Sequence, residues 1–311
     1  MRNSVRSIVA VSLIAGSSFA FTGIASAQPA AADTKPPSIT LKAGSLVSND
    51  LYKSVSYALA DDVAVDFVEV NGVKKDLSNN RWSDLNGLRP GVFGAVEGLN
   101  TVVVVDTSGN RTSTTVKLDS KGPAVSVKPE SLGGATAYRN LSLKLNDPAK
   151  VDRVVLNGVV KDLSDNVWSD LNGIKPGVFG AVEGPNTLVS LDVLGNSSTF
   201  TFNLDTTAPL VAERTQVYNP KQGGRTDVTL VFTEPVTGLP QGWNAVGGSA
   251  TTYTKAFYSK VQAVTVTFVD VAAGNPGSYT FDYVPSSAPT APQPEVPTIP
   301  LPSTGSSIFG S

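Results

Sequence analysis

Residues 65–76 have the sequence Val-Asp-Phe-Val-Glu-Val-Asn-Gly-Val-Lys-Lys-Asp, and this stretch decides the fold class. A run rich in β-branched residues ends at Val70, and a second strand-like run begins at Val73. Between them lies Asn71-Gly72, and both residues accept the positive φ of a type I′ turn. The stretch therefore predicts a β-hairpin.

The same hairpin recurs at Asn157-Gly158, because residues 33–118 and 119–204 are one unit written twice. Between 70–100 and 156–186, 24 of 31 positions are identical. A fixed interval of 86 residues relates the three openings Asp33-Thr-Lys-Pro-Pro, Asp119-Ser-Lys-Gly-Pro and Asp205-Thr-Thr-Ala-Pro. The same interval separates Trp82 from Trp168, Asp106 from Asp192, and Asn110 from Asn196. Tandem copies favour a protein that needs reach or repeated contacts over one with a single catalytic pocket.

Each copy carries a second hairpin signal. Thr101–Val105 is a nearly continuous apolar run, as expected for a strand that is central in a sheet. The turn residues 106–110 interrupt it, and a strand-like run follows at Thr112–Leu118. No window has a helical period over the length that a helix needs. Many short strands with Gly and Asn turns predict an antiparallel sandwich.

Residues 205–284 form a diverged third unit. Strand-like runs lie at 228–236, 264–269 and 278–283, and Asp270 and Gly274-Asn275 separate the last two. We therefore predict an all-β fold of three tandem antiparallel β-sandwich domains at 33–118, 119–204 and 205–284, followed by a disordered tail at 285–311.

These units resemble bacterial immunoglobulin-like (Big-type) domains. The resemblance rests on the D-x-x-x-P openings, the strand–Asp–Gly-Asn hairpins and the stretch Val231-Phe-Thr-Glu-Pro-Val236, and it covers about 33–284. It implies immunoglobulin-like sandwiches. Domains of this family serve as spacers, adhesins and enzyme accessories and have no fixed catalytic residues, so the resemblance says little about function.

The first 27 residues have the form of a secretory signal peptide. Arg2 and Arg6 give the positive start, Ile8–Ala15 is a short apolar stretch, and Ala25-Ser26-Ala27 is a small-x-small cleavage site. The apolar stretch is shorter than the roughly 20 residues that span a bilayer. We expect export, and an uncleaved anchor is the alternative.

The C-terminal segment is rich in proline, with seven prolines between Pro285 and Pro302. Proline favours an extended, solvated spacer. The spacer leads into Leu301-Pro302-Ser303-Thr304-Gly305, which resembles the LPxTG sorting signal of Gram-positive surface proteins. The resemblance implies that a sortase cleaves after Thr304 and joins it to peptidoglycan. Such signals continue with an apolar segment and a basic stop, whereas only Ser306–Ser311 follows here. A shortened C-terminus, a released protein and an accidental match remain open.

Charge and composition exclude several kinds of partner. Arg2 and Arg6 are the only charged residues of the first 27, so 22 Lys and Arg and 26 Asp and Glu remain in 284 residues. With this acidic balance and no basic run, we expect neither nucleic-acid binding nor attraction to an anionic membrane. The chain has no cysteine, so each domain must be stable from its own core.

The chain also has no histidine, which excludes a Ser-His-Asp triad, a Cys-His pair and imidazole-ligated zinc. Carboxylate pairs remain available. Glu97 and Glu183 are duplicated acids without an evident partner, and a glycosidase would need two carboxylates that converge. We predict that the protein is not an enzyme, and a carboxylate-based hydrolase is the less favoured alternative.

The remaining candidate site residues are tryptophans and aspartates. We expect Trp82 and Trp168 to fill sandwich interiors, together with Phe93 and Phe179, and we take Trp243 in its turn-rich stretch as the exposed candidate for ligand contact. The sets Asp76, Asp84, Asp106 and Asp162, Asp170, Asp192 offer oxygen ligands for calcium, but no spacing matches an EF-hand and Asp at turns usually caps backbone N–H groups. The linkers at Asp119 and Asp205 are the next place to look. We predict no cofactor, with calcium as the open alternative.

The sequence thus favours a secreted surface protein attached to the cell wall through Thr304, acting as a spacer or adhesion module. Sortase and peptidoglycan are its partners if the sorting motif is used, together with an unidentified host, wall or matrix ligand. The alternative is a released carbohydrate- or wall-binding module that uses exposed tryptophans.

Overall fold

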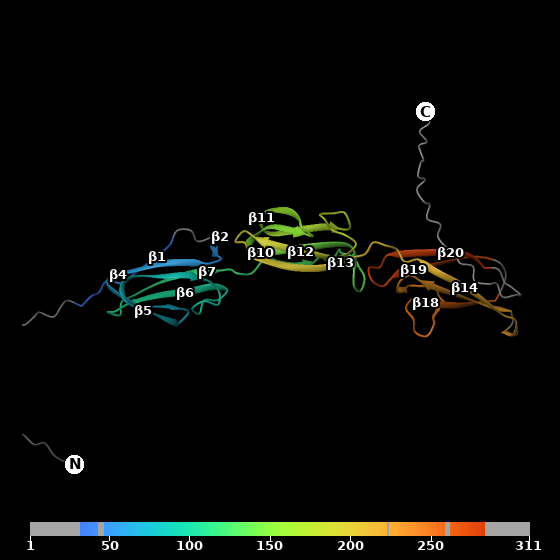
Figure 1. Cartoon of the computed structure of the whole chain (residues 1–311), viewed down its shortest axis with the longest axis horizontal. Coiled ribbons are helices and arrows are strands. Elements are labelled where there is room, and N and C mark those ends of the chain that lie inside the picture. The colour runs from blue at the N-terminus through green and yellow to red at the C-terminus, as the bar shows by residue number, and fades with distance from the viewer. Residues whose placement is uncertain (1–31, 43–46, 223, 259–261, 284–311) are drawn as a thin grey trace, which may run out of the picture.

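The computed structural model describes residues 32–42, 47–222, 224–258 and 262–283. Its strands form three groups that follow one another along a single long axis (Figure 1). Within the described residues the only helical element is the 3-10 turn η1 (Pro220–Gln222). The predicted all-β fold is confirmed. The predicted signal peptide and the tail that carries Leu301–Gly305 lie outside the described residues.

The strands have the following bounds. Domain 1 contains β1 (Ser38–Leu41), β2 (Val47–Ser48), β3 (Leu51–Tyr52), β4 (Val55–Val70), β5 (Val73–Leu88), β6 (Gly98–Asp106) and β7 (Arg111–Leu118). Domain 2 contains β8 (Ala124–Val127), β9 (Leu132–Gly133), β10 (Tyr138–Leu156), β11 (Val159–Ile174), β12 (Gly184–Asp192) and β13 (Ser197–Leu204). Domain 3 contains β14 (Val211–Asn219), β15 (Arg225–Phe232), β16 (Val236–Thr237), β17 (Asn244–Ala245), β18 (Thr252–Phe257), β19 (Gln262–Asp270) and β20 (Pro276–Tyr283).

The predicted Asn-Gly hairpin is the turn between β4 and β5. Asn71 has φ 48° and Gly72 has φ 82°, as a type I′ turn requires. Both strands run for 16 residues, much further than the sequence runs indicated. Their pairing shifts register between Ala60 and Val65, and such a bulge bends a strand pair. On the other side of β4, β1 pairs with its first half and β6 with its second half.

Each domain buries its own apolar core, and the first two follow the same plan. In β6, Val102 and Val104 are fully buried and pack with β4 residues such as Val68. A separate cluster around Leu141 and Leu188 fills domain 2. Since burying one such side chain contributes roughly 1.5–3 kcal/mol, each core stabilises its domain without a disulfide.

Domain 3 is also built from β-strands around an apolar core, but the arrangement of its sheets and the residues of its core differ. Its strands form two sheets, β14-β15-β18-β17 and β16-β19-β20. Aromatic rings meet between the sheets, and the centroids of Phe232 and Phe268 are 4.7 Å apart in an edge-to-face arrangement. Within the described residues, no helix of sufficient length and hydropathy to cross a bilayer is found.

Candidate functional site at the seams between domains

The first seam is made where the β2–β3 hairpin of domain 1 lies against β10 and the turn between β12 and β13 of domain 2. The hydroxyl of Ser48 donates to the carbonyl of Ala149 at 2.7 Å, and the Asn49 side chain donates to the carbonyl of Pro148 at 2.9 Å. The ammonium of Lys53 donates to the carbonyl of Gly195 at 2.9 Å. Leu51, Ala149 and Leu194 add a small buried apolar cluster across the seam.

The second seam repeats this scheme between domains 2 and 3. The backbone N–H groups of Ala135 and Ala137 donate to the carbonyls of Val271 and Ala272, at 2.9 and 2.8 Å. Arg139, at the position equivalent to Lys53, donates to the carbonyl of Gly274 at 2.9 Å. The two seams are therefore built by equivalent segments and join neighbouring domains end to end.

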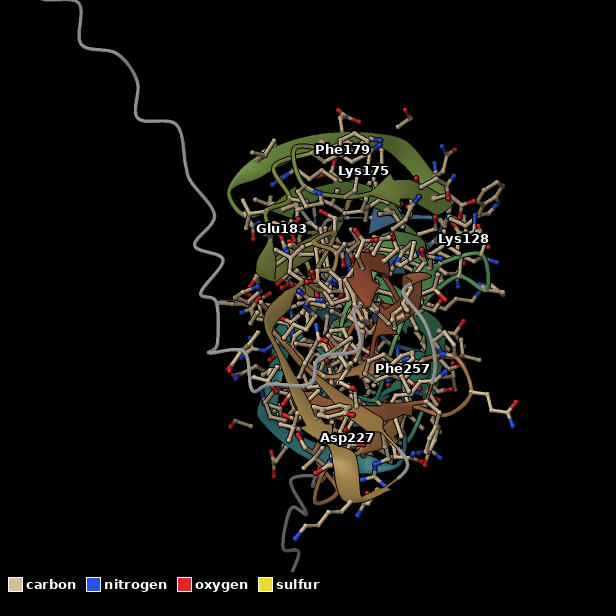
Figure 2. The ribbon with its side chains drawn as sticks, turned by 90° about the vertical axis from the view of Figure 1, so that its right-hand side faces the viewer. Lys128, Lys175, Phe179, Glu183, Asp227 and Phe257 are labelled. Atoms are coloured by element: carbon tan, nitrogen blue, oxygen red, sulfur yellow. The ribbon has the colours of Figure 1, made fainter. Side chains whose placement is uncertain are left out.

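The duplicated glutamates hold the linkers rather than each other. Both carboxylate oxygens of Glu97 accept hydrogen bonds from Ser120, one from its N–H at 2.9 Å and one from its hydroxyl at 2.7 Å. Glu183 accepts the N–H and the hydroxyl of Thr206 in the same way. Figure 2 looks along the rod and shows Glu183 on the ribbon of domain 2. Each glutamate braces its own domain against the linker that follows it.

Acidic side chains gather at the start of every domain. The ligand-capable oxygens of each group lie within 4.8 Å of one another. The groups are Asp33, Asp61 and Asp62 in domain 1, Asp119, Asp147 and Asp192 at the first seam, and Asp205, Glu234 and Asp270 at the second seam. We call the middle group the first-seam cluster.

The first-seam cluster is the only one of the three in which every member is buried: Asp119, Asp147 and Asp192 have exposed fractions of 4%, 2% and 1%. No ion pair among the described residues reaches any of them. At an effective dielectric constant of about 20, two unit charges about 5 Å apart repel by about 3 kcal/mol. The ionised cluster is therefore strongly unfavourable without a compensating charge.

This environment moves the pKa values of the cluster. Burial raises the pKa of Asp119 to about 6, and a hydrogen bond with Glu97 and the charges of Asp192 and Glu97 add to the rise, while the N–H of Lys121 opposes it. Burial raises the pKa of Asp147 to about 7, and the charge of Asp119 contributes, while the N–H of Ala149 acts in the other direction. A hydrogen bond between two carboxyl groups needs a proton on one of them. Binding either a proton or a cation would therefore stabilise the ionised cluster.

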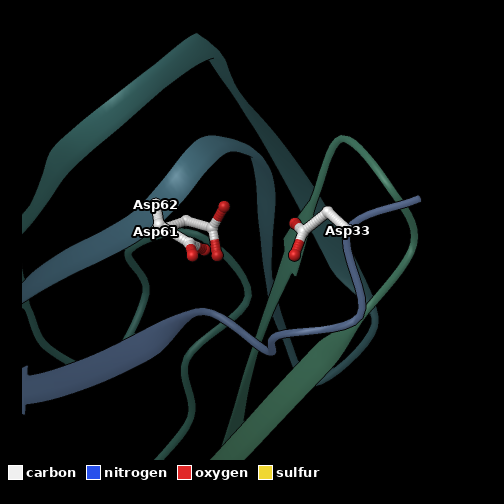
Figure 3. A group of neighbouring side chains, drawn as sticks. All are labelled: Asp33, Asp61 and Asp62. Atoms are coloured by element: carbon white, nitrogen blue, oxygen red, sulfur yellow. The ribbon is translucent and has the colours of Figure 1, made fainter. Parts of the chain in front are cut away.

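The clusters at the two ends of this series are more open. In Figure 3, Asp61 and Asp62 lie together on the ribbon of β4, and Asp33 lies across from them on the N-terminal segment. Asp62 is exposed and forms an ion pair with Lys35 at 3.6 Å. At the second seam, burial raises the pKa of Glu234, and Asp205 and Asp270 act in the same direction.

The aspartate sets singled out in the sequence do not come together. The Asp76 carboxylate accepts the N–H of Ser78, and Asp84 pairs with Lys42 at 2.7 Å. Asp106 accepts hydrogen bonds from Asn110. In the second copy, Asp162 accepts the N–H of Ser164 and Asp170 pairs with Lys128. Only Asp192 joins a cluster, because the linker and the register shift of β10 between Asn146 and Val151 bring Asp119 and Asp147 to it.

The expected roles of the tryptophans are reversed. Trp82 and Trp168 lie on the surface of β5 and β11, with exposed fractions of 74% and 60%. Trp243, the predicted exposed residue, packs against the core of domain 3 with its ring centroid 6.3 Å from that of Phe257. The pattern of β5 puts Leu77 and Leu85 inside, and the smaller Leu side chains fill the interior that Trp was expected to fill.

The duplicated phenylalanines also lie outside the predicted core. Phe93 is exposed and has φ 50°, and the Lys75 ammonium lies 4.3 Å from its ring centroid. Phe179 packs against the edge of the domain 2 core under Lys161, 3.9 Å from the ring centroid. Figure 2 shows Phe179 at the rim of that domain. A turn rather than a bulged strand occupies this stretch.

Comparison with known proteins gives structural neighbours only. Neither the protein-family models nor the curated proteins match this chain. A 1.5-MDa bacterial ice-binding adhesin aligns over 80% of this chain and 98% of its own, at 15% identity and a TM-score of 0.27. The human desmocollin-1 ectodomain aligns over 79% of this chain and 57% of its own, at 17% identity and a TM-score of 0.22. Bacteroides ovatus SGBP-B, solved with a mixed-linkage heptasaccharide, aligns over 78% of this chain and 66% of its own, at 16% identity and a TM-score of 0.20. At these values no function transfers to this chain.

Sequence reasoning missed Asp61, Asp147 and Glu234 as members of the acidic groups. Asp61 and Asp147 stand 86 residues apart, the same interval that relates Asp33 to Asp119. That signal was present, but only the fold brings the loop and the linker together. The position 86 residues after Asp147 is 233, and Glu234 follows it by one residue. The place of Glu234 in its acidic group therefore depends on the diverged backbone of domain 3.

Proposed function

We propose that this protein is a secreted surface protein of Gram-positive type that serves as an extended spacer or adhesion module. The observation that carries the proposal is the repeated seam. Equivalent segments of domains 1 and 2 contact the next domain through hydrogen bonds from Lys53 and Arg139. Contacts that recur at each junction restrain the angle between neighbouring domains and so extend the reach of the chain.

The signal peptide and the motif Leu301–Gly305 support a position outside the cell. In this proposal a sortase joins Thr304 to peptidoglycan, and the Pro-rich segment from Pro285 holds the domains away from the wall. The role is display or adhesion, and the acids available for catalysis serve structure instead. The ligand is a molecule of the host, the wall or the matrix.

Mass spectrometry of muramidase digests of the wall tests the attachment. We expect a fragment of this chain that ends at Thr304 and carries a peptidoglycan stem peptide, and we expect its loss in Thr304→Ala. Recovery of the chain only in the culture medium, with residues beyond Thr304 intact, would contradict wall attachment and favour a released module.

A second candidate function is binding of a wall or matrix glycan by the exposed tryptophans. Trp82 and Trp168 occupy equivalent positions in two domains and are largely exposed, so the rod presents two similar aromatic surfaces. Aromatic faces stack on apolar sugar faces, and two linked sites bind a repeating polymer more tightly than one.

Sedimentation of the chain with insoluble wall polysaccharide tests this candidate. We expect retention of the wild-type chain and a loss of at least tenfold in affinity for the double variant Trp82→Ala, Trp168→Ala, with the single variants in between. Val160→Ala, which removes an exposed apolar residue of β11, is the control. Equal retention of all variants would contradict glycan binding by these tryptophans and would leave the spacer role unaffected.

The hydrolase alternative has a separate test. The full chain should release no product from wall glycan or peptide, because Glu97 and Glu183 lie in different domains and each is hydrogen-bonded to its linker. Turnover that disappears in Glu97→Gln, Glu183→Gln would overturn the proposed role.

A further inference from the structure

We propose that the first-seam cluster is a Ca²⁺ site at the junction of domains 1 and 2. Asp119, Asp147 and Asp192 are its ligands, and Glu97 of domain 1 lies beside them. The proposed function rests on this seam, and the proposal adds a bound calcium ion to it. The calcium site does not depend on whether the chain is attached to a wall.

An unpartnered buried oxygen distinguishes this cluster from an ordinary acidic surface. Oδ1 of Asp119 accepts the N–H of Lys121, whereas Oδ2 is buried and, apart from a proton shared with Glu97, has no hydrogen-bond donor among the described residues. Asp119 as a whole residue is only 4% exposed. A buried ionised oxygen without a donor is costly, and a bound cation satisfies it.

No positive side chain forms an ion pair with the three aspartates in the described residues, although the charge of Lys121 acts on Glu97. Lys53 donates to the carbonyl of Gly195. The cluster therefore lacks an ion-paired protein cation while three acids converge on it.

The geometry and the donor type fit calcium. Calcium binds six to eight oxygen atoms at about 2.3–2.6 Å, so two ligands on opposite sides of one ion are about 5 Å apart. The three aspartates offer oxygens within 4.8 Å of one another. Magnesium requires near-octahedral geometry at about 2.0–2.1 Å and usually keeps several waters, so a site built from several converging carboxylates suits calcium better. Asp147 and Asp192 also accept local N–H groups, which orient their carboxylates for a shared ion.

The two other acidic groups fit a cation less well. Asp33 and Asp61 also have a buried Oδ2 without a donor among the described residues, but Asp62 is exposed and Lys35 already neutralises part of the first group. At the second seam, the carboxylate of Asp270 accepts three backbone N–H groups, from Ala273, Gly274 and Asn275. We therefore expect the first-seam cluster to have the highest affinity for calcium.

Titration calorimetry of the full chain with CaCl₂, after removal of divalent ions, tests the proposal, with MgCl₂ as the comparison. We expect a saturable calcium site that binds magnesium at least tenfold more weakly. Asp147→Asn should weaken its affinity at least tenfold. Asp165→Asn, which changes an exposed aspartate of the same domain, should bind as the wild type does.

Asp119→Asn provides a second variant with an isosteric change, and far-UV circular dichroism checks that each variant is folded. Absence of a saturable calcium site in the wild type would overturn the proposal. Unchanged affinity in both Asp147→Asn and Asp119→Asn would overturn it as well, because calcium would then be bound elsewhere. Neither result depends on wall attachment, which the digest of Thr304 fragments measures separately.

Discussion

Asn186 shows how one buried side chain organises a loop in each duplicated domain. Its Oδ1 accepts the N–H of Val182 at 2.9 Å and the side-chain amide of Asn157 at 2.7 Å. Its Nδ2 donates to the carbonyls of Val182 and Gly184, both at 2.8 Å. Asn100 makes the same bonds in domain 1, so the arrangement belongs to the repeat.

We expect Asn186→Ala to destabilise domain 2 by about 2–4 kcal/mol, because buried backbone groups lose their partners. Hydrogen exchange of the β12 amides measures this loss. Thr199→Ala, on the exposed face of β13, should change the stability by less than about 0.5 kcal/mol. Equal protection of β12 in both variants would contradict the role of Asn186.

The pKa of Asp147 leads to a pH prediction for the metal-free protein. Burial is the main cause that raises this pKa from 3.8 to about 7, so the folded state favours the neutral acid. The contribution of Asp147 to stability is therefore complete below about pH 4 and is lost as the pH rises through about 7. In a chelator, Asp147→Asn should be more stable than the wild type near pH 8 and similar to it near pH 4. Denaturant unfolding at both pH values measures the difference, and a difference independent of pH would refute the assignment.

Residue types predicted the turns well and the exposure of large rings poorly. Asn71 and Gly72 adopt the φ values that their pair indicates, because turn chemistry is local. The positions of Trp82 and Trp243 depend on which face of a strand meets the core, and Trp82 is on the face of β5 opposite to Leu77 and Leu85.

At the scale of elements, β6 and β7 lie where the sequence placed them. The apolar run from Thr101 ends at Asp106, and the Gly-Asn turn returns the chain into β7. The short β2–β3 hairpin was not predicted, although it makes the first seam. Its strands have two residues each and carry no periodic pattern.

Gly134 is the element-scale test of the second seam. A Cβ at this position would lie 2.5 Å from the carbonyl oxygen of Val271 and 2.6 Å from that of Ala272, both backbone atoms of domain 3. Gly134→Ala should therefore push the domains apart and weaken the hydrogen bonds from Ala135 and Ala137. We expect faster hydrogen exchange at these two amides, by at least tenfold, with unchanged protection in the β10 core. Thr199→Ala again serves as the control, and unchanged exchange at the seam would show that the contact is not formed in solution.

At the scale of the whole molecule, the number of β-rich units followed from the repeat, whereas the seams did not. An interval of 86 residues identifies copies but says nothing about contacts between them. Those contacts depend on loops that meet only after each domain has folded. The acidic clusters likewise depend on the tertiary fold, since Asp119 comes from the linker and Asp147 from β10.

Small-angle X-ray scattering of residues 28–311 tests most directly the claim that the domains form an extended rod. A compact body of 284 residues has a radius of gyration of about 19 Å. We predict a value well above this, a cross-section close to that of one domain, and a pair-distance distribution with a long tail. A radius of gyration near about 19 Å with a symmetric distribution would mean that the domains merge into one body, and it would contradict the account.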